Sequence, residues 1–157
     1  MHRNRNAAMK TYDFAKLQAR WFPTTVEVNN QYIYGNVEYV INVSTKEYPE
    51  EVAEAMKKCR IKSYHFPLVE TGNDMGLDNI LKAVKVIMEA DREGAAAVVH
   101  CDWGNNRSRV VAECFHYVKT GTHFIDEYKG EMNHLAWNCG QGHLPELKEM
   151  EQILKQL

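Results

Sequence analysis

The residues best suited to chemistry stand together in one short segment, 100–108. Cys101 follows His100, and Arg107 and Ser108 come six and seven positions after the cysteine. A cysteine thiolate is a strong nucleophile, and the planar fork of an arginine holds two phosphate oxygens at once. This combination suits attack of sulfur on phosphorus with a covalent phosphocysteine intermediate.

The position of the segment supports this chemistry. An apolar run rich in valine, 95–100, precedes it and predicts a buried strand, and apolar residues at helical spacing follow Arg107. A loop between the carboxyl end of a strand and a helix presents unpaired N–H groups and positive partial charge, which favour a thiolate and a phosphate. Gly104 allows such a loop to turn its N–H groups inward, and Ser108 can donate a hydrogen bond to the sulfur of Cys101.

Elements that alternate along the chain would hold this loop. Strands are expected over 37–43, 63–69 and 95–100, and helices over 49–59, over 77–90 and from Arg107 to the break at Thr120-Gly121. Apolar strands separated by amphipathic helices predict an α/β fold, with a central, mostly parallel sheet of about four to five strands flanked by helices.

Both ends of the chain carry weaker patterns. The stretch 12–21 is expected to be partly helical, and 25–28 and 31–34 to be strands that turn at Asn29-Asn30. From Phe124 onward the pattern indicates a helical C-terminal part, whose last helix would start at Leu144-Pro145.

Length and composition predict a single domain over 1–157, because 157 residues with 45% hydrophobic content suffice for one core. A net charge of −2 offers no broad attraction to nucleic acid or to an anionic membrane. No apolar run has the length of a membrane span or a signal peptide, so we expect a cytoplasmic protein; its oligomeric state is left open. Four cysteines in a chain of this length favour reduced thiols, with Cys59 and Cys114 on helix faces, where either could trap an oxidised Cys101 as a disulfide if it lies close enough.

The segment 100–108 resembles the signature of the cysteine-dependent phosphatases of the tyrosine and dual-specificity type. That signature is His-Cys, two residues, Gly, two residues, Arg, then Ser or Thr, and all fixed positions are matched here. The resemblance covers about 37–120 and implies a dual-specificity-phosphatase-like fold that needs no cofactor. It implies that Cys101 attacks phosphorus, that His100 orients the cysteine and that Ser108 assists breakdown of the phosphocysteine. The backbone amides of Asp102, Trp103, Gly104, Asn105, Asn106 and Arg107 would bind the phosphoryl oxygens.

The family also uses an aspartate as general acid on the loop after the preceding strand. Glu70, three residues after Pro67, stands at that place here, which departs from the family pattern. Glutamate can transfer the proton, but its extra methylene shifts the carboxyl group. We favour Glu70 as the acid and keep Asp74 as a second candidate. The helix start at 77–79 resembles that of a family member acting on a phosphorylated glycerolipid, which keeps a non-protein substrate open.

Several residues near the segment have two readings. Asp102 places a carboxylate beside the expected thiolate; we expect it to point outward as a solvated loop residue, the alternative being recognition of a cationic feature near the substrate phosphate. For Trp103 the two alternatives are lining the pocket and packing on neighbouring helices. His134, Cys139 and His143 match no standard zinc spacing, so no metal is expected.

The sequence thus predicts a phosphate-monoester hydrolase whose partner is a phosphorylated protein or a small phosphate ester. One rival is a catalytically weak phosphate-binding module, which the glutamate at the acid position and Asp102 would favour. Another is thiol chemistry such as sulfur transfer, against which Ser108 and the acid loop argue. Phosphotyrosine, phosphoserine, phosphoinositides and sugar phosphates all stay open as substrates.

Overall fold

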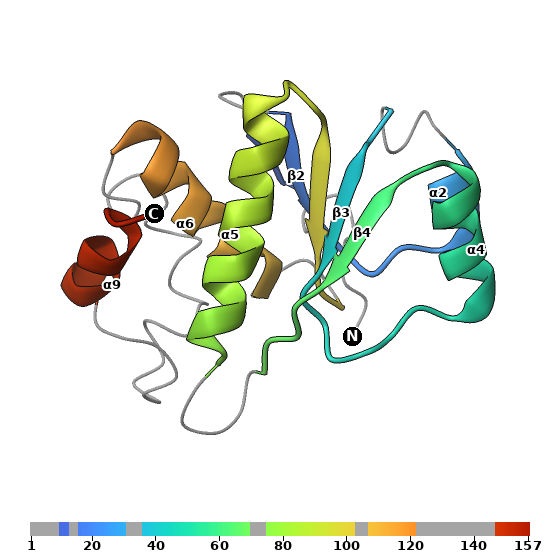
Figure 1. Ribbon diagram of the computed structural model, residues 1–157. Helices are drawn as coiled ribbons and strands as arrows, with labels where there is room; N and C mark the ends of the chain where they lie inside the picture. Colours follow the sequence, from blue (N-terminus) through green and yellow to red (C-terminus); the bar gives the residue numbers. More distant parts are fainter. Residues whose placement is uncertain (1–9, 13–15, 31–35, 70–74, 103–106, 122–146) are drawn as a thin grey trace.

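The computed structural model describes residues 10–12, 16–30, 36–69, 75–102, 107–121 and 147–157. Within these residues, five strands form one sheet in the order β1-β2-β5-β3-β4 (Figure 1). The strands are β1 (Lys10–Tyr12), β2 (Leu17–Arg20), β3 (Tyr39–Asn42), β4 (Lys62–His65) and β5 (Ala97–His100). Only β1 runs antiparallel to its neighbour, and the other three pairings are parallel. The mostly parallel α/β sheet predicted from the sequence is confirmed.

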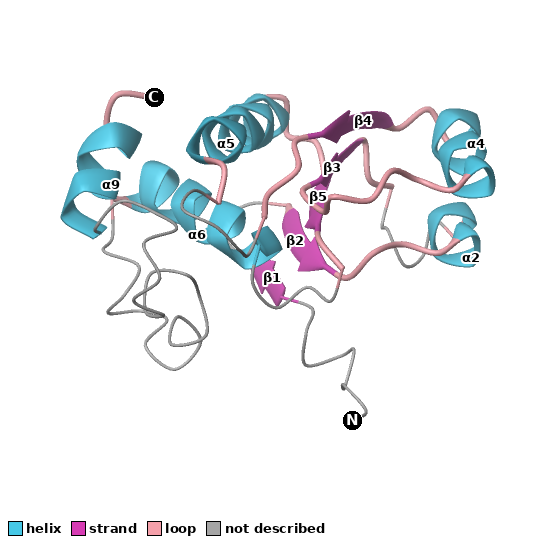
Figure 2. Ribbon diagram, turned by 90° about the horizontal axis from the view of Figure 1, so that it is seen from below, coloured by secondary structure: helices cyan, strands magenta, loops and turns pink. Residues whose placement is uncertain are grey.

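Helices cover both faces of the sheet. On one side lie α2 (Thr25–Asn29) and α4 (Glu50–Lys58), and on the other α5 (Leu77–Arg92), α6 (Arg107–Thr120) and α9 (Leu147–Leu154) (Figure 2). Because side chains of a strand alternate between faces, Val40 and Val98 join the apolar cluster under α4, whereas Ile41 and Val99 join the larger cluster under α5 and α6. Strands buried on both faces are the reason for the continuously apolar runs in the sequence.

The four parallel strands end at the same level. Asn42 is opposite both His100 and His65, and Arg20 is opposite His100 on the other side. The loops that follow these residues therefore meet at one edge of the sheet, which is where ligands bind in open parallel sheets.

The prediction of a partial helix over 12–21 is wrong. This stretch contains the end of β1 and all of β2, and β2 pairs with β5 in the interior of the sheet. Leu17 and Ala19 are buried on the face under α6, so packing outweighs the helical preference of the neighbouring polar residues.

The prediction of a strand over 25–28 is also wrong, because Thr25–Asn29 forms α2. Thr24 accepts a hydrogen bond from the backbone of Glu27, whose side chain accepts one from the backbone of Thr24. This capping box outweighs the strand preference of the valines. The predicted strand 31–34 lies outside the described residues, as does 122–146, and the last helix begins at Leu147.

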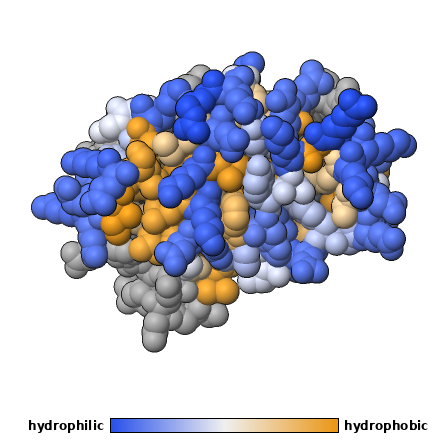
Figure 3. Space-filling view, viewed as in Figure 1, coloured by the Kyte–Doolittle hydropathy of each residue, from blue (hydrophilic) through white to orange (hydrophobic). Residues whose placement is uncertain are grey.

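The surface seen from the α5 side is largely polar, with apolar side chains gathered between α5 and α9 (Figure 3). On α5, Leu81 and Met88 are partly buried against the core. Within the described ranges, no helix has the length and apolar character needed to span a membrane.

Candidate active site

Cys101 directly follows β5 and has only 3% of its surface exposed. Its Sγ lies 3.4 Å from Oγ of Ser108, which is fully buried in the first turn of α6. A thiolate can only accept a hydrogen bond, so in that state the Ser108 hydroxyl donates. The neighbouring strand ends fix the backbone here, since the N–H of Cys101 donates to the carbonyl of Arg20 and the N–H of Val43 to that of His100. The cysteine and the serine are thus brought together at the N-terminus of a helix, where negative charge is favoured.

His100 holds the backbone of the cysteine in place. Its Nδ1 lies 3.3 Å from the carbonyl oxygen of Cys101, and its Nε2 lies 2.6 Å from the hydroxyl of Tyr48. Because a carbonyl only accepts, Nδ1 carries the proton, and Nε2 of the neutral ring accepts from Tyr48. The ring of Phe22 meets the imidazole edge-on with centroids 5.1 Å apart. Sequence reasoning missed Tyr48, which lies 52 positions from His100 and belongs to no local motif.

Complete burial lowers the pKa of His100 from its ordinary 6.5 to about 3, against weaker opposing effects of the Cys101 carbonyl and the Asp102 charge. Between pH 3 and pH 6.5, His100 is therefore protonated in the unfolded chain and neutral in the folded chain. Stability should therefore fall as the pH drops from about 6.5 towards 3, by up to about 1.4 kcal/mol per pH unit from this residue.

Chemical unfolding at several pH values would measure this slope in the wild type and in His100→Gln. The slope should be shallower in the variant, which has nothing to titrate at this position, whereas Asp102 and the other carboxylates are present in both proteins. Equal slopes would show that His100 titrates alike in the folded and unfolded states.

Arg107 begins α6 and is 7% exposed. Its Nη2 donates to Oδ2 of Asp102 at 2.8 Å, and its Nη1 donates to the carbonyl oxygen of Leu68 at 3.2 Å. The guanidinium is therefore held between the end of β5 and the segment that follows β4. This is the same edge of the sheet at which Cys101 lies.

The expectation that Asp102 points outward is wrong. Besides the ion pair with Arg107, its Oδ1 accepts a hydrogen bond from Ser44 Oγ at 2.9 Å and lies 3.6 Å from Nζ of Lys46. Partial burial favours the neutral acid, but the hydrogen bonds from Arg107 and Ser44 and the charges of Arg107 and Lys46 outweigh it and lower the pKa of Asp102. Both carboxylate oxygens are engaged by the chain itself, which argues against recognition of a cationic substrate feature.

The chain was compared with known proteins by sequence and by structure. The sequence matches no protein-family model and none of the curated proteins. The structure is similar to that of PTPMT1 in complex with PI(5)P, with a TM-score of 0.74, 14% identity and coverage of 94% of this chain and 97% of that one. The chain has the fold of the protein tyrosine and dual-specificity phosphatases.

Two further structures share this phosphatase fold. The core catalytic domain of the PP-IP phosphatase SIW14 from S. cerevisiae has a TM-score of 0.64 at 14% identity, with 94% of this chain and 83% of that one covered. TpbA of P. aeruginosa has a TM-score of 0.65 at 14% identity, with 98% and 94% covered. These alignments span 94% of this chain or more.

Both acid candidates, Glu70 and Asp74, lie outside the described residues. The neck of their loop is well defined, since the N–H of Val69 donates to the carbonyl of Met75 at 2.9 Å. Gly76 then has φ 120°, which residues with a side chain rarely adopt, and a Cβ there would also lie 3.2 Å from Leu68 Cδ2, so the backbone at this position favours glycine. The neck is one residue along the chain from either candidate and favours neither.

The remaining predicted phosphate-binding residues, Trp103, Gly104, Asn105 and Asn106, lie outside the described residues, so the role of their amides stays a prediction. His134, Cys139 and His143 lie outside them as well. In the part of the chain that the structure describes, no three or more His, Cys, Asp or Glu side chains are grouped to hold a metal ion.

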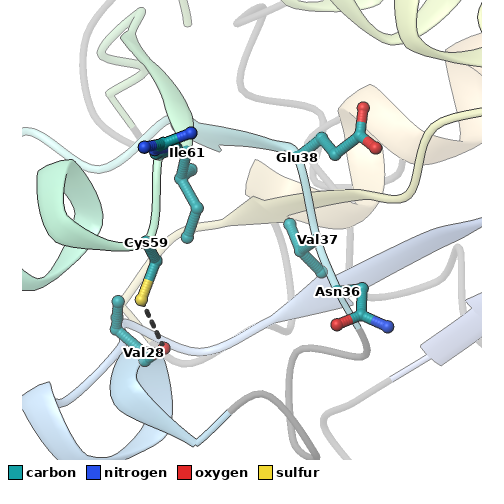
Figure 4. Close-up of a pocket in the computed structure, with 7 residues that line it drawn as sticks. Val28, Asn36, Val37, Glu38, Cys59 and Ile61 are labelled. Atoms are coloured by element: carbon teal, nitrogen blue, oxygen red, sulfur yellow. Dashed lines mark hydrogen bonds between the residues drawn. The ribbon is translucent and has the colours of Figure 1, made fainter.

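Cys59 lies far from this site. It borders a cavity of about 240 Å³ where β3 and β4 begin, and its Sγ points to the carbonyl oxygen of Val28 at 3.6 Å (Figure 4). The cavity is lined by Val28, Asn36, Val37, Glu38, Cys59, Arg60 and Ile61. The four-residue strands, each about 13 Å long, separate this edge from Cys101, too far for a disulfide. Cys114 is fully buried in α6, where burial raises its pKa and keeps the thiol protonated.

Proposed function

We propose that the protein is a cysteine-dependent phosphate-monoester hydrolase with Cys101 as nucleophile and Arg107 as phosphate clamp. The observation that supports it most is the contact of the Cys101 sulfur with the Ser108 hydroxyl at the N-terminus of α6, together with an Arg107 guanidinium that Asp102 and Leu68 hold at the same edge of the sheet. A thiolate there would be stabilised by the helix dipole and by the Ser108 hydrogen bond. The same positive field would draw in the phosphate.

The reaction would proceed in two displacements. The Cys101 thiolate attacks phosphorus, the P–S bond forms and the P–O bond to the leaving group breaks, while Glu70 or Asp74 gives that oxygen a proton. Arg107 and the amides of 102–107 hold the equatorial oxygens, whose charge is spread in the transition state. Water then attacks the phosphocysteine, giving up a proton to the acid residue, and the P–S bond breaks. Ser108 donates its hydrogen bond to the departing thiolate.

The substrate class is part of the proposal. Among the structural neighbours, PTPMT1 was solved with PI(5)P, SIW14 is described as a PP-IP phosphatase and TpbA was solved with pTyr. These names span a protein residue, a lipid headgroup and an inositol pyrophosphate. We therefore propose a phosphorylated protein or a small phosphate ester, and the assay must offer both.

A specific observation favours a second candidate, a module that binds phosphate without turnover. The Asp102 carboxylate comes directly after the nucleophile in the chain, and its negative charge opposes formation of the Cys101 thiolate, which turnover needs and phosphate binding does not.

The test is release of phosphate near pH 6, with a metal chelator present, from para-nitrophenyl phosphate, phosphotyrosine and phosphoserine peptides and PI(5)P. Glu70→Gln and Asp74→Asn are assayed beside the wild type. The true acid should matter most for phosphoserine, whose alkoxide leaves poorly without a proton, and least for para-nitrophenyl phosphate. A wild type that releases nothing yet binds tungstate would instead be the phosphate-binding module.

A further inference from the structure

We propose that Asp102 is a positioning residue that fixes the guanidinium of Arg107 for phosphate binding. The inference rests on the proposed function and adds to it a residue that the phosphatase signature leaves unspecified. Asp102 and Arg107 together connect the segments that follow three neighbouring strands. Asp102 itself follows β5, Ser44 follows β3 and Leu68 follows β4.

Hydrogen bonds within the loop after β3 orient Ser44 towards the carboxylate of Asp102. Oδ1 of Asn42 accepts from the N–H of Ser44 at 2.9 Å, and Nδ2 of Asn42 donates to the carbonyl of Lys46 at 2.8 Å. The Ser44 hydroxyl accepts from the N–H of Lys46 at 3.0 Å, which leaves its single proton for Oδ1 of Asp102. The buried Ser44 and the asparagine that supports it therefore orient Asp102 from a fixed backbone.

The carboxylate in turn orients the arginine. Two contacts on different nitrogens, Nη1 to Leu68 and Nη2 to Asp102, determine both the place and the plane of the guanidinium. An arginine with many rotamers would otherwise have to be ordered when the phosphate binds, which weakens binding. The spacing of the signature places Arg107 near Cys101, and the contact with Asp102 fixes the orientation of the Arg107 guanidinium.

Asp102 could instead compete with the substrate, if its carboxylate took up the Arg107 N–H donors that a phosphate would bind. The geometry favours positioning, because Oδ1 is held by Ser44 and Lys46 and only Oδ2 reaches the arginine. This single contact engages one of the five N–H donors of a guanidinium. A competing carboxylate would be expected to pair through both oxygens.

The experiment compares tungstate affinity, by calorimetry in the Cys101→Ser background, for Asp102→Ala, Asp102→Asn and Ser44→Ala. Glu47→Gln is the matched control, since Glu47 is an exposed carboxylate of the same loop. We expect roughly tenfold weaker binding for Asp102→Ala, a smaller loss for Asp102→Asn and Ser44→Ala, and no change for Glu47→Gln. With Cys101 present, the same variants should raise KM for para-nitrophenyl phosphate more than they lower kcat.

The outcomes separate the inference from the function. If Asp102→Ala binds tungstate as tightly as its parent or more tightly, Asp102 does not position the clamp, whereas phosphate release by the wild type would still support the hydrolase. If the wild type binds tungstate but releases no phosphate, the hydrolase fails and the binding series still decides the inference. Should Asp102→Ala fail to fold, wild-type affinity in both Asp102→Asn and Ser44→Ala would overturn it.

Discussion

Replacing Cys101 with serine is expected to abolish phosphate release and to leave oxyanion binding nearly intact. A serine hydroxyl at this position is protonated at neutral pH and is a far weaker nucleophile than a thiolate. Hydrolases that lose a covalent nucleophile typically slow by on the order of 10⁵-fold or more. The Arg107 guanidinium and the α6 N-terminus stay in place, because serine is nearly isosteric with the buried cysteine.

The measurement is phosphate release from para-nitrophenyl phosphate together with the dissociation constant for tungstate. Cys59→Ser is the matched control, since this second thiol lies at the opposite edge of the sheet beside the cavity of Figure 4. It should keep the wild-type rate. Residual phosphate release by Cys101→Ser above about 1% of wild type would show that another group attacks phosphorus. If Cys59→Ser also lost its rate, the loss in Cys101→Ser would be explained by a general effect of replacing a cysteine and not by loss of the nucleophile.

How much of this site the sequence could predict depends on how local each contact is. Cys101 and Ser108 meet because the end of β5 and the start of α6 are only a few residues apart in the chain, and the apolar pattern of the sequence shows this order of strand and helix. The parallel direction of β3, β4 and β5 follows likewise from amphipathic helices between apolar strands, whereas their order in the sheet was not predicted. The two wrong assignments have different causes. The helix α2 follows from a local pattern, the Thr24–Glu27 capping box, whereas β2 is a strand because it pairs with β5, about 80 residues away.

The partners of the site could not be predicted, since they come from distant parts of the chain. Tyr48 reaches His100 across 52 positions, and Ser44 reaches Asp102 across 58. Repulsion between a carboxylate and the expected thiolate made Asp102 unusual in the sequence. Its orientation, however, depends on the hydrogen-bond donors Ser44 and Arg107, and Ser44 comes near Asp102 only in the folded sheet. The strands β3 and β5 end at the same level, with Asn42 opposite His100, and the loops that follow them therefore lie side by side.

Replacing Arg107 with lysine tests whether the planar fork, and not merely a positive charge, is required. Lysine can still form an ion pair with Asp102, but it cannot contact Leu68 and Asp102 from two nitrogens of one plane, nor hold two phosphate oxygens in parallel. We expect kcat/KM for para-nitrophenyl phosphate to fall by about 10²–10³-fold, the scale of losing a preorganised donor to developing charge.

Arg92→Lys, an exposed change in the last turn of α5, is the control and should leave kcat/KM unchanged. Tungstate affinity separates the two ways in which Arg107 could act. If binding weakens far less than kcat/KM, the fork acts mainly on the transition state; if both fall together, it acts as a uniform clamp on phosphate. An Arg107→Lys protein with wild-type kcat/KM would mean that charge alone is sufficient, and the orientation imposed by Asp102 would then have no catalytic purpose.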